Sequence, residues 1–437
     1  MPLETVRRNW HKVAAMKRLG VLATTAIFLL SFPFFAQGAT KSIAQIPMTL
    51  ITALSSSNQS VGMVVKGKMI YLIGNVTGVA STDGFVQALD VTGAVQWSLP
   101  LDNGSNEIAT AATIDSGGNI WVVGSAQTPT ATPTPSTTPS GSPTPAPSVS
   151  AIPSATALNP DAIAINPVPP MRKDLTSLIL WKISPAGSLV ATYSTEIGVP
   201  FLVRNAIFAN HLINVVGIIS TTSGHAGFLI QSDPSGTFGK PILVGNSDTE
   251  LNAITRKSDG SLVLMGSSSE TIAKQPRKGL RDGIIVAMRQ PGIISSVVRS
   301  SNTSSARTWQ SSTSSLFLGG DALAGKKGEA VVTKFGSTLL PAWTIRFASS
   351  GPALTADAPA SHFMLFSSTG PIGGINGWKP RSSAALTLVL DAKGALKGVY
   401  GAPAIATPMA IGYSTELGIV VLGRGPAGVS IFHALPR

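Results

Sequence analysis

Short apolar runs separated by turns rich in Gly, Asn and Asp dominate the chain after its first forty residues. Ile108–Ile114 and Ile120–Gly124 are two such runs, and Asp115–Asn119 between them has the composition of a tight hairpin turn. Upstream, Phe85–Asp90 alternates apolar and polar residues and is followed by Ala94–Leu99, as expected of half-buried strands. We predict that these four strands form one blade of an antiparallel fold.

A glycine closes an apolar run seven times, at intervals of about fifty residues. These glycines are Gly74, Gly124, Gly217, Gly266, Gly319, Gly370 and Gly423. One interval is double, and it contains a Pro/Thr-rich insertion of about 45 residues whose removal restores the period. A period near fifty with several short strands per unit is typical of a β-propeller. We therefore predict an all-β, seven-bladed β-propeller over residues 46–437.

The two ends of this region predict how the ring closes. Val429–Leu435 is one more outer-type strand after the last repeat, while Met48–Leu54 and Gly62–Gly74 supply strands that lack that partner. Joining the ends would complete a seventh blade and remove an open sheet edge that would otherwise invite aggregation. We expect the C-terminal strand to close the ring.

The N-terminus predicts export. Five basic residues between Arg7 and Arg18 precede an apolar, helix-forming run from Leu19 to Phe35, and Ala36–Ala39 offers small residues for cleavage. Residues 1–39 therefore have the layout of a signal peptide, but the run is also near the length of an uncleaved membrane anchor. Both alternatives place the rest of the chain outside the cytoplasm, secreted or anchored by one span.

The insertion, residues 127–170, consists of Pro, Thr and Ser with almost no charge. Such a composition cannot bury a core, so we expect it to be disordered within the propeller. It is either a mucin-like segment carrying O-linked sugars or an unmodified loop insertion.

One unit resembles a known repeat family. Gly84–Asp90, Gly93, Trp97-Ser98 and Ile114–Gly124 are similar to the exported bacterial propeller repeats of the SBBP group. The resemblance implies an extracellular propeller and supplies no catalytic residue. A weaker similarity to quinoprotein propellers lies in Ala88–Trp97, but the spacing there is one residue short. We expect no cofactor.

Composition narrows the function further. Apolar residues make up 43% of the chain and charged residues only 12%. The chain has no cysteine, which excludes disulfides, Cys-ligated zinc and thiol nucleophiles. Its net charge of +12 falls to +8 without the N-terminal segment, which favours anionic surfaces without indicating a nucleic-acid binder.

Two groups of residues are candidate binding sites. In a propeller, the loops between blades and the loops joining second to third strands share one face, and three successive units carry basic residues in the latter loops. They are Lys274, Arg277, Lys278, Arg281, Lys326, Lys327, Lys379 and Arg381. Starts of inner strands should line the channel entrance, and the candidates there are Arg204, Asn205, Glu250, Asn252, Arg307, Trp309 and His362. Each group has an alternative interpretation: the basic loops would serve only to keep the protein soluble, and the entrance residues would only cap the channel.

Catalytic motifs are scarce. The five histidines show no metal-binding spacing, and no Gly-x-Ser-x-Gly elbow occurs. Paired carboxylates among Asp102, Glu107, Glu196 and Glu250 could still support glycoside hydrolysis. We therefore expect a monomeric, non-catalytic binding or scaffold protein without a metal, which engages an anionic cell-envelope polymer or a surface protein. The alternatives are an extracellular carbohydrate-active enzyme and a purely structural surface protein.

Overall fold

A computed structural model describes residues 42–54, 59–78, 81–128, 171–301, 303–325 and 327–436. These residues form strands and turns and contain no helix, and so none that could cross a membrane. The predicted N-terminal helix (residues 1–39) and most of the predicted insertion (residues 127–170) lie outside the described residues.

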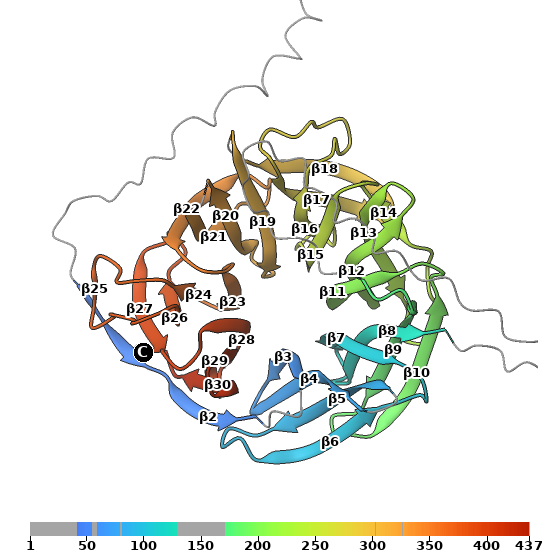
Figure 1. The fold of residues 1–437 in the computed structure, drawn as a ribbon, viewed down its shortest axis with the longest axis horizontal. Helices are drawn as coiled ribbons and strands as arrows, with labels where there is room; N and C mark the ends of the chain where they lie inside the picture. The colour runs from blue at the N-terminus through green and yellow to red at the C-terminus, as the bar shows by residue number, and fades with distance from the viewer. Residues whose placement is uncertain are drawn as a thin grey trace, which may run out of the picture. The chain divides into compact units, whose positions relative to one another are not determined.

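Most described strands belong to four-stranded antiparallel sheets, the blades of a β-propeller (Figure 1). The first three are β3 (Gln59–Lys66), β4 (Met69–Thr77), β5 (Thr82–Leu89), β6 (Val95–Leu101); β7 (Glu107–Ile114), β8 (Ile120–Gln127), β9 (Leu175–Ile183), β10 (Leu189–Glu196); and β11 (Phe201–Ala209), β12 (Leu212–Thr221), β13 (Gly224–Ser232), β14 (Ile242–Val244). The next two are β15 (Thr249–Arg256), β16 (Leu262–Ser268), β17 (Asp282–Gln290), β18 (Ile293–Ser300); and β19 (Ser305–Ser312), β20 (Phe317–Ala324), β21 (Lys327–Phe335), β22 (Pro341–Ala348). The last consists of β28 (Thr407–Ser414), β29 (Gly418–Gly425), β30 (Gly428–Ala434) and β2 (Thr49–Ala53).

The remaining sheet has six strands. It consists of β23 (Leu354–Ala358), β24 (Ser361–Ser368), β26 (Ala384–Leu390), β27 (Leu396–Ala402), β1 (Ile43–Pro47) and β25 (Ile375–Asn376). β1 pairs parallel with both β27 and β25, so the N-terminal strand extends an otherwise antiparallel sheet. The sheets follow one another around an axis, and each innermost strand contacts the next, with β28 contacting β3 (Figure 1).

The structure corrects the predicted seven-bladed ring closed by its C-terminal strand. It has six four-stranded blades, and the sheet of β23 to β27 departs from that form because β1 and β25 add to it. The two ends do join in one sheet, as predicted, but β30 is its third strand and the N-terminal β2 is the outermost strand that pairs with it. The predicted blade is also divided differently: residues 84–99 share a sheet with the hairpin at residues 62–74, and residues 108–124 belong to the next sheet.

A β-bulge explains the periodic glycine. In all six four-stranded blades the innermost strand carries one extra residue opposite a glycine of the second strand. At Gly124, Gly217 and Gly266 a Cβ would lie 1.9, 2.0 and 1.8 Å from a carbonyl oxygen of the bulged strand. In the β19–β22 blade this position is Gly320, one residue after the predicted Gly319. The six-stranded sheet has neither bulge nor glycine there, and the predicted Gly370 lies in open space after β24.

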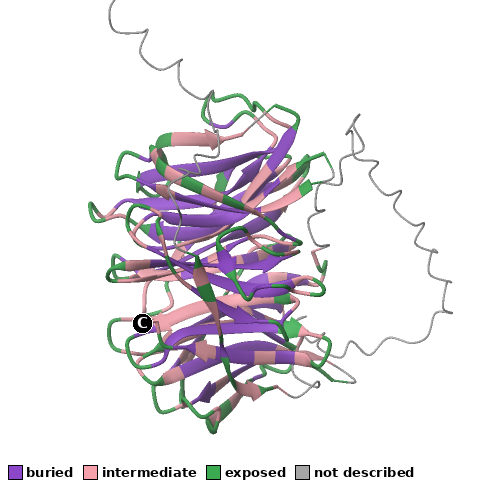
Figure 2. Ribbon diagram, turned by 90° about the vertical axis from the view of Figure 1, so that its left-hand side faces the viewer, coloured by how far each residue is buried: buried purple, intermediate pink, exposed green. Residues whose placement is uncertain are grey.

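The core lies between neighbouring sheets, and exposed residues gather at the turns (Figure 2). Aromatic residues of outermost strands join consecutive sheets at three places. Trp97, Tyr193 and Trp343 each cover a turn glycine of the next sheet, and a Cβ on Gly187, Gly236 or Gly394 would overlap the ring. The Trp343 indole also donates a hydrogen bond of 3.0 Å to the Ala392 carbonyl.

Candidate functional site

The strand order defines two opposite faces of the ring. Within an antiparallel sheet, the connections from second to third strand lie at the same end as those leading to the next sheet. Backbone contacts confirm this, because Arg281 before β17 bridges to Ala306 of β19, and His225 of β13 bridges to Asp248 before β15. We call this end the loop face and the end with the other hairpin turns the turn face.

Five of the predicted entrance residues lie near the loop-face ends of consecutive innermost strands. Arg204 lies on β11, Glu250 and Asn252 on β15, and Arg307 and Trp309 on β19. Arg204 and Asn252 are themselves the bulged residues of their strands. Asn252 is buried and donates a hydrogen bond of 3.1 Å to the Trp309 carbonyl.

The other two predicted entrance residues, Asn205 and His362, add little to the entrance. Asn205 follows the bulge on β11 and pairs with Val216. His362 lies on β24 near the turn face, where its Nδ1 is 2.7 Å from Asp357 Oδ1 and its ring packs against Phe317. The structure therefore does not bring His362 to the entrance. A lone histidine in a strand carries no signal of which end of the sheet it occupies.

An ion network, buried at Arg281 and Glu250 and partly exposed at Asp248, lies beside this entrance. The Arg281 guanidinium donates to Asp248, to Glu250 Oε1 at 2.8 Å and to Ser267 Oγ at 2.7 Å. His225 Nε2 lies 3.3 Å from the same Asp248 carboxylate. Burial raises the pKa of Asp248, but the hydrogen bond from His225 and the charge of Arg281 outweigh it and hold this pKa well below its usual range. We call Arg281, Asp248, Glu250 and His225 the Arg281 network.

Two arginines next to this network are poorly neutralised. The Arg307 guanidinium stacks on the Trp309 ring at 4.1 Å and donates to Thr333 Oγ1 at 3.0 Å. Burial, with the nearby charge of Arg346, lowers the pKa of Arg307 to about 9. Arg204 Nε is buried without a hydrogen-bond partner among the described residues, and burial lowers the pKa of Arg204 although Glu250 opposes this.

Asp321 of β20 completes the charged group. Burial raises its pKa to about 6, and the charge of Glu250 adds to this effect. Its Oδ1 is buried without a hydrogen-bond partner among the described residues. Asp321, Asp248 and His225 were not among the predicted entrance residues, because that prediction considered only the starts of innermost strands. Asp321 lies on a second strand, and Asp248 and His225 lie in or beside connections. The entrance thus combines arginines that can bind an anion with carboxylates that are mostly paired.

Farther from the loop face, mostly apolar side chains of the innermost strands line an open hollow. Its volume is about 350 Å³, and Val64, Ile114, Ala206 and Ile411 are among its lining residues. These residues come from the later parts of β3, β7, β11 and β28. The charged entrance and this hollow are therefore distinct regions of the same ring.

The predicted basic loops are distributed as follows. Lys274, Arg277 and Lys278 are exposed in the β16–β17 connection, and Lys379 and Arg381 are exposed between β25 and β26. Lys327 is exposed at the start of β21, and Lys326 lies outside the described residues. Arg281 is the exception: it is buried in its network, so it adds no cation to the surface.

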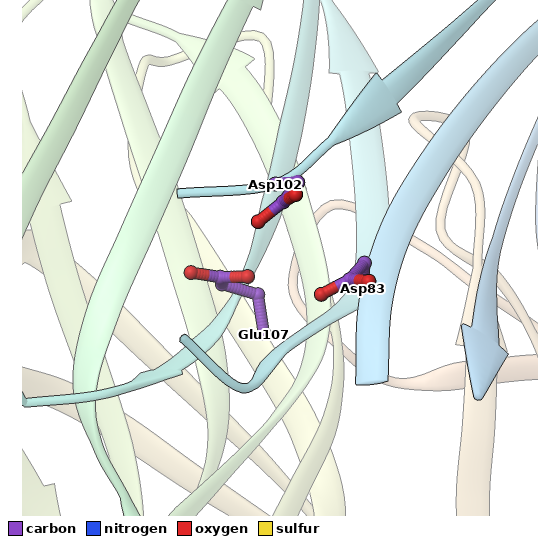
Figure 3. A group of neighbouring side chains, drawn as sticks. All are labelled: Asp83, Asp102 and Glu107. Carbon is purple, nitrogen blue, oxygen red and sulfur yellow. The ribbon is translucent and has the colours of Figure 1, made fainter. Parts of the chain in front are cut away.

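The four candidate carboxylates do not face one another across the channel. Glu250 is paired with Arg281, and Glu196 is exposed at the end of the outermost strand β10. Asp102 and Glu107 do meet, together with Asp83, which sequence reasoning missed (Figure 3). Asp83 and Asp102 lie at the open end of the β5–β6 hairpin, where Gly84 pairs with Leu101, whereas Glu107 begins the next blade.

Comparisons with known proteins support the fold alone. No protein-family model matches the chain, and no curated protein is similar to it. A chain of Kuenenia stuttgartiensis hydrazine synthase is 8% identical, with 88% of this chain and 97% of that chain covered and a TM-score of 0.50. YCF48 bound to D1 peptide is 11% identical (93% and 99% covered, TM-score 0.47), and the polysaccharide lyase Uly1 is 10% identical (94% and 94%, TM-score 0.46). The sheet order shows that the chain is an all-β protein with a β-propeller fold, and the hydrazine synthase likeness extends over most of this fold.

Proposed function

We propose that this protein is a non-catalytic β-propeller that binds a polyanionic polymer on the loop face of the sheets formed by β15 to β27. The observation that carries the proposal is a succession of exposed cations on three neighbouring sheets. Lys274, Lys278, Lys327, Lys379 and Arg381 are exposed there and make no salt bridge among the described residues.

Unpaired cations on neighbouring loops favour long anions over small ones. A polymer can contact several loops at once, and each contact adds a modest, salt-dependent attraction. Arg204 and Arg307 at the adjoining entrance offer guanidinium groups that suit carboxylate or phosphate groups of the same polymer. Asp282, at the end of the β16–β17 connection, does not offset these cations, because it is buried and paired with Arg299 at 3.0 Å.

Charge reversal tests the proposal. The K274E/R277E/K278E variant should bind heparin and polyphosphate about tenfold or more weakly at low salt, and the difference should shrink as salt screens the charges. The matched control is K66E/K68E/K393E, which changes the net charge equally at the turn face. Equal losses in both variants would indicate nonspecific attraction and refute a loop-face site, as would unchanged binding in the first.

We further propose that the protein works outside the cytoplasm, as a secreted or membrane-anchored component of the cell envelope. The support is the order of basic residues, apolar run and small residues in residues 1–39. Fractionation of cells that produce the full chain with a C-terminal tag should place the tag in the envelope or the medium. Deletion of residues 1–39 should leave it in the cytoplasm, and a cytoplasmic full-length chain would contradict the proposal.

A further inference from the structure

Three carboxylates converge on the loop face where the first two blades meet. Asp83 lies near the start of β5, Asp102 in the β6–β7 connection, and Glu107 is the first residue of the innermost strand β7. One oxygen from each lies within 4.8 Å of the others, and the three side chains point toward one another (Figure 3). We call these residues the acidic triad.

The surroundings of Glu107 do not neutralise it. Its side chain is fully buried, and while Oε1 accepts a hydrogen bond of 2.9 Å from Ser105, Oε2 has no partner among the described residues. Burial raises the pKa of Glu107, and the charges of Asp102 and Asp83 add to this. A buried carboxylate without a counter-ion is strongly unfavourable.

Asp83 repeats this arrangement. Its Oδ2 accepts a hydrogen bond of 3.0 Å from Ser81, and its Oδ1 is buried without a partner. No Lys, Arg or His of the described chain forms a salt bridge with any member of the triad. Two inward-facing oxygens therefore lack both a donor and a cation.

We propose that the acidic triad binds one divalent cation, and that this cation is Ca²⁺. Calcium takes carboxylate oxygens at 2.3–2.6 Å, so two oxygens on one ion lie at most about 5 Å apart. The spacing within the triad meets this limit. Three carboxylates supply hard ligands and more than enough charge for one divalent ion, and water or main-chain oxygens complete the coordination.

A cation here would join two blades beside the predicted insertion. Asp83 belongs to the β3–β6 blade and Glu107 to the β7–β10 blade. Asn106, next to Glu107, accepts a hydrogen bond of 3.0 Å from the Thr82 backbone and donates to Gln127 Oε1 at 3.2 Å. Gln127 is the last residue of β8, so the site supports the strand from which the Pro/Thr-rich segment departs. This region is separate from the basic loops, and either proposal can fail without the other.

The full chain, freed of metal with a chelator, should bind one Ca²⁺ in a calorimetric titration and melt at a higher temperature with Ca²⁺ than without it, because a ligand of the native state stabilises that state. E107Q should abolish Ca²⁺ binding. Without the metal, E107Q should be at least as stable as the wild type, since it removes an unpaired buried charge. A merely structural Glu107 would instead make E107Q less stable whether or not Ca²⁺ is present.

Further variants keep the test decisive if E107Q fails to fold. D102N changes an exposed member of the triad and should weaken Ca²⁺ binding at least tenfold, whereas E196Q, an exposed carboxylate on β10, should bind as the wild type does. Absence of Ca²⁺ binding by the wild type, binding of Mg²⁺ only, or unchanged binding by E107Q or D102N would overturn the proposal.

Discussion

Replacing a bulge glycine tests the explanation of the repeat most directly. Gly217 of β12 faces the bulge of β11, and an alanine Cβ there would lie 2.0 Å from the Leu202 carbonyl oxygen and 2.9 Å from the Phe228 ring. Gly370 is the natural control, because the sequence places it at the same position of the repeat. No heavy atom lies within 4 Å of where its Cβ would be.

The size of the effect follows from these distances. Ordinary contact with a Cβ begins at about 3.4 Å, so the Leu202 carbonyl must retreat by more than 1 Å. That oxygen is backbone, so no side chain can rotate away and the bulge itself must move. Overpacking of this kind costs about 1–3 kcal/mol, and the rigid obstacle places Gly217→Ala near 3 kcal/mol or above. Gly370→Ala should be neutral or stabilise by about 0.5 kcal/mol through its effect on the unfolded chain.

Urea denaturation followed by tryptophan fluorescence measures both variants, since the chain contains seven tryptophans. We expect the midpoint of Gly217→Ala to fall well below that of the wild type, and the midpoint of Gly370→Ala to stay close to it. Equal midpoints for the two variants would show that the bulge yields easily, and would refute the idea that it selects glycine.

Two further predictions concern buried charge at the entrance. The pKa of Asp321 is about 6 in the folded protein, against the ordinary 3.8, so the wild type loses stability as pH rises between these values. The free energy of unfolding of D321N should therefore be about 2–3 kcal/mol larger than that of the wild type above pH 6, and equal to it near pH 4. A gap that does not change between pH 4 and pH 7 in urea denaturation would contradict this. R281M removes the counter-ion of Asp248 and Glu250 and should lower the free energy of unfolding by about 3–5 kcal/mol at pH 7. K397M, which breaks an exposed pair, should lower it by less than about 1 kcal/mol. Because the pKa of Asp248 is lowered in the folded protein, the stability that R281M loses relative to the wild type should become smaller below pH 4, where this carboxylate is protonated in the unfolded chain. A loss of stability in R281M no larger than that in K397M would refute this prediction.

Site residues were predictable only where position along a repeat decides their surroundings. Arg204, Glu250 and Arg307 share the start of an innermost strand, so the repeat itself brings them to the entrance. Arg281 lies in the same connection as the exposed Lys278, yet it is buried because Asp248, just before β15, and Glu250, on β15, lie within its reach. The acidic triad joins residues of two blades, which no local pattern could reveal.

The amino-acid sequence by itself determined the strands, their turns and the propeller class. Each hairpin depends on neighbouring residues: Gly93, Gly118 and Gly187 all adopt positive φ at the turns where the sequence calls for them. Tertiary structure alone decided which hairpins share a sheet, because a periodic pattern looks the same wherever the repeat is taken to begin. The sequence indicated that the two ends meet, but only the tertiary structure showed the parallel addition of β1 and the place of β2 as the outermost strand, since both depend on strand edges meeting across nearly the whole length of the chain.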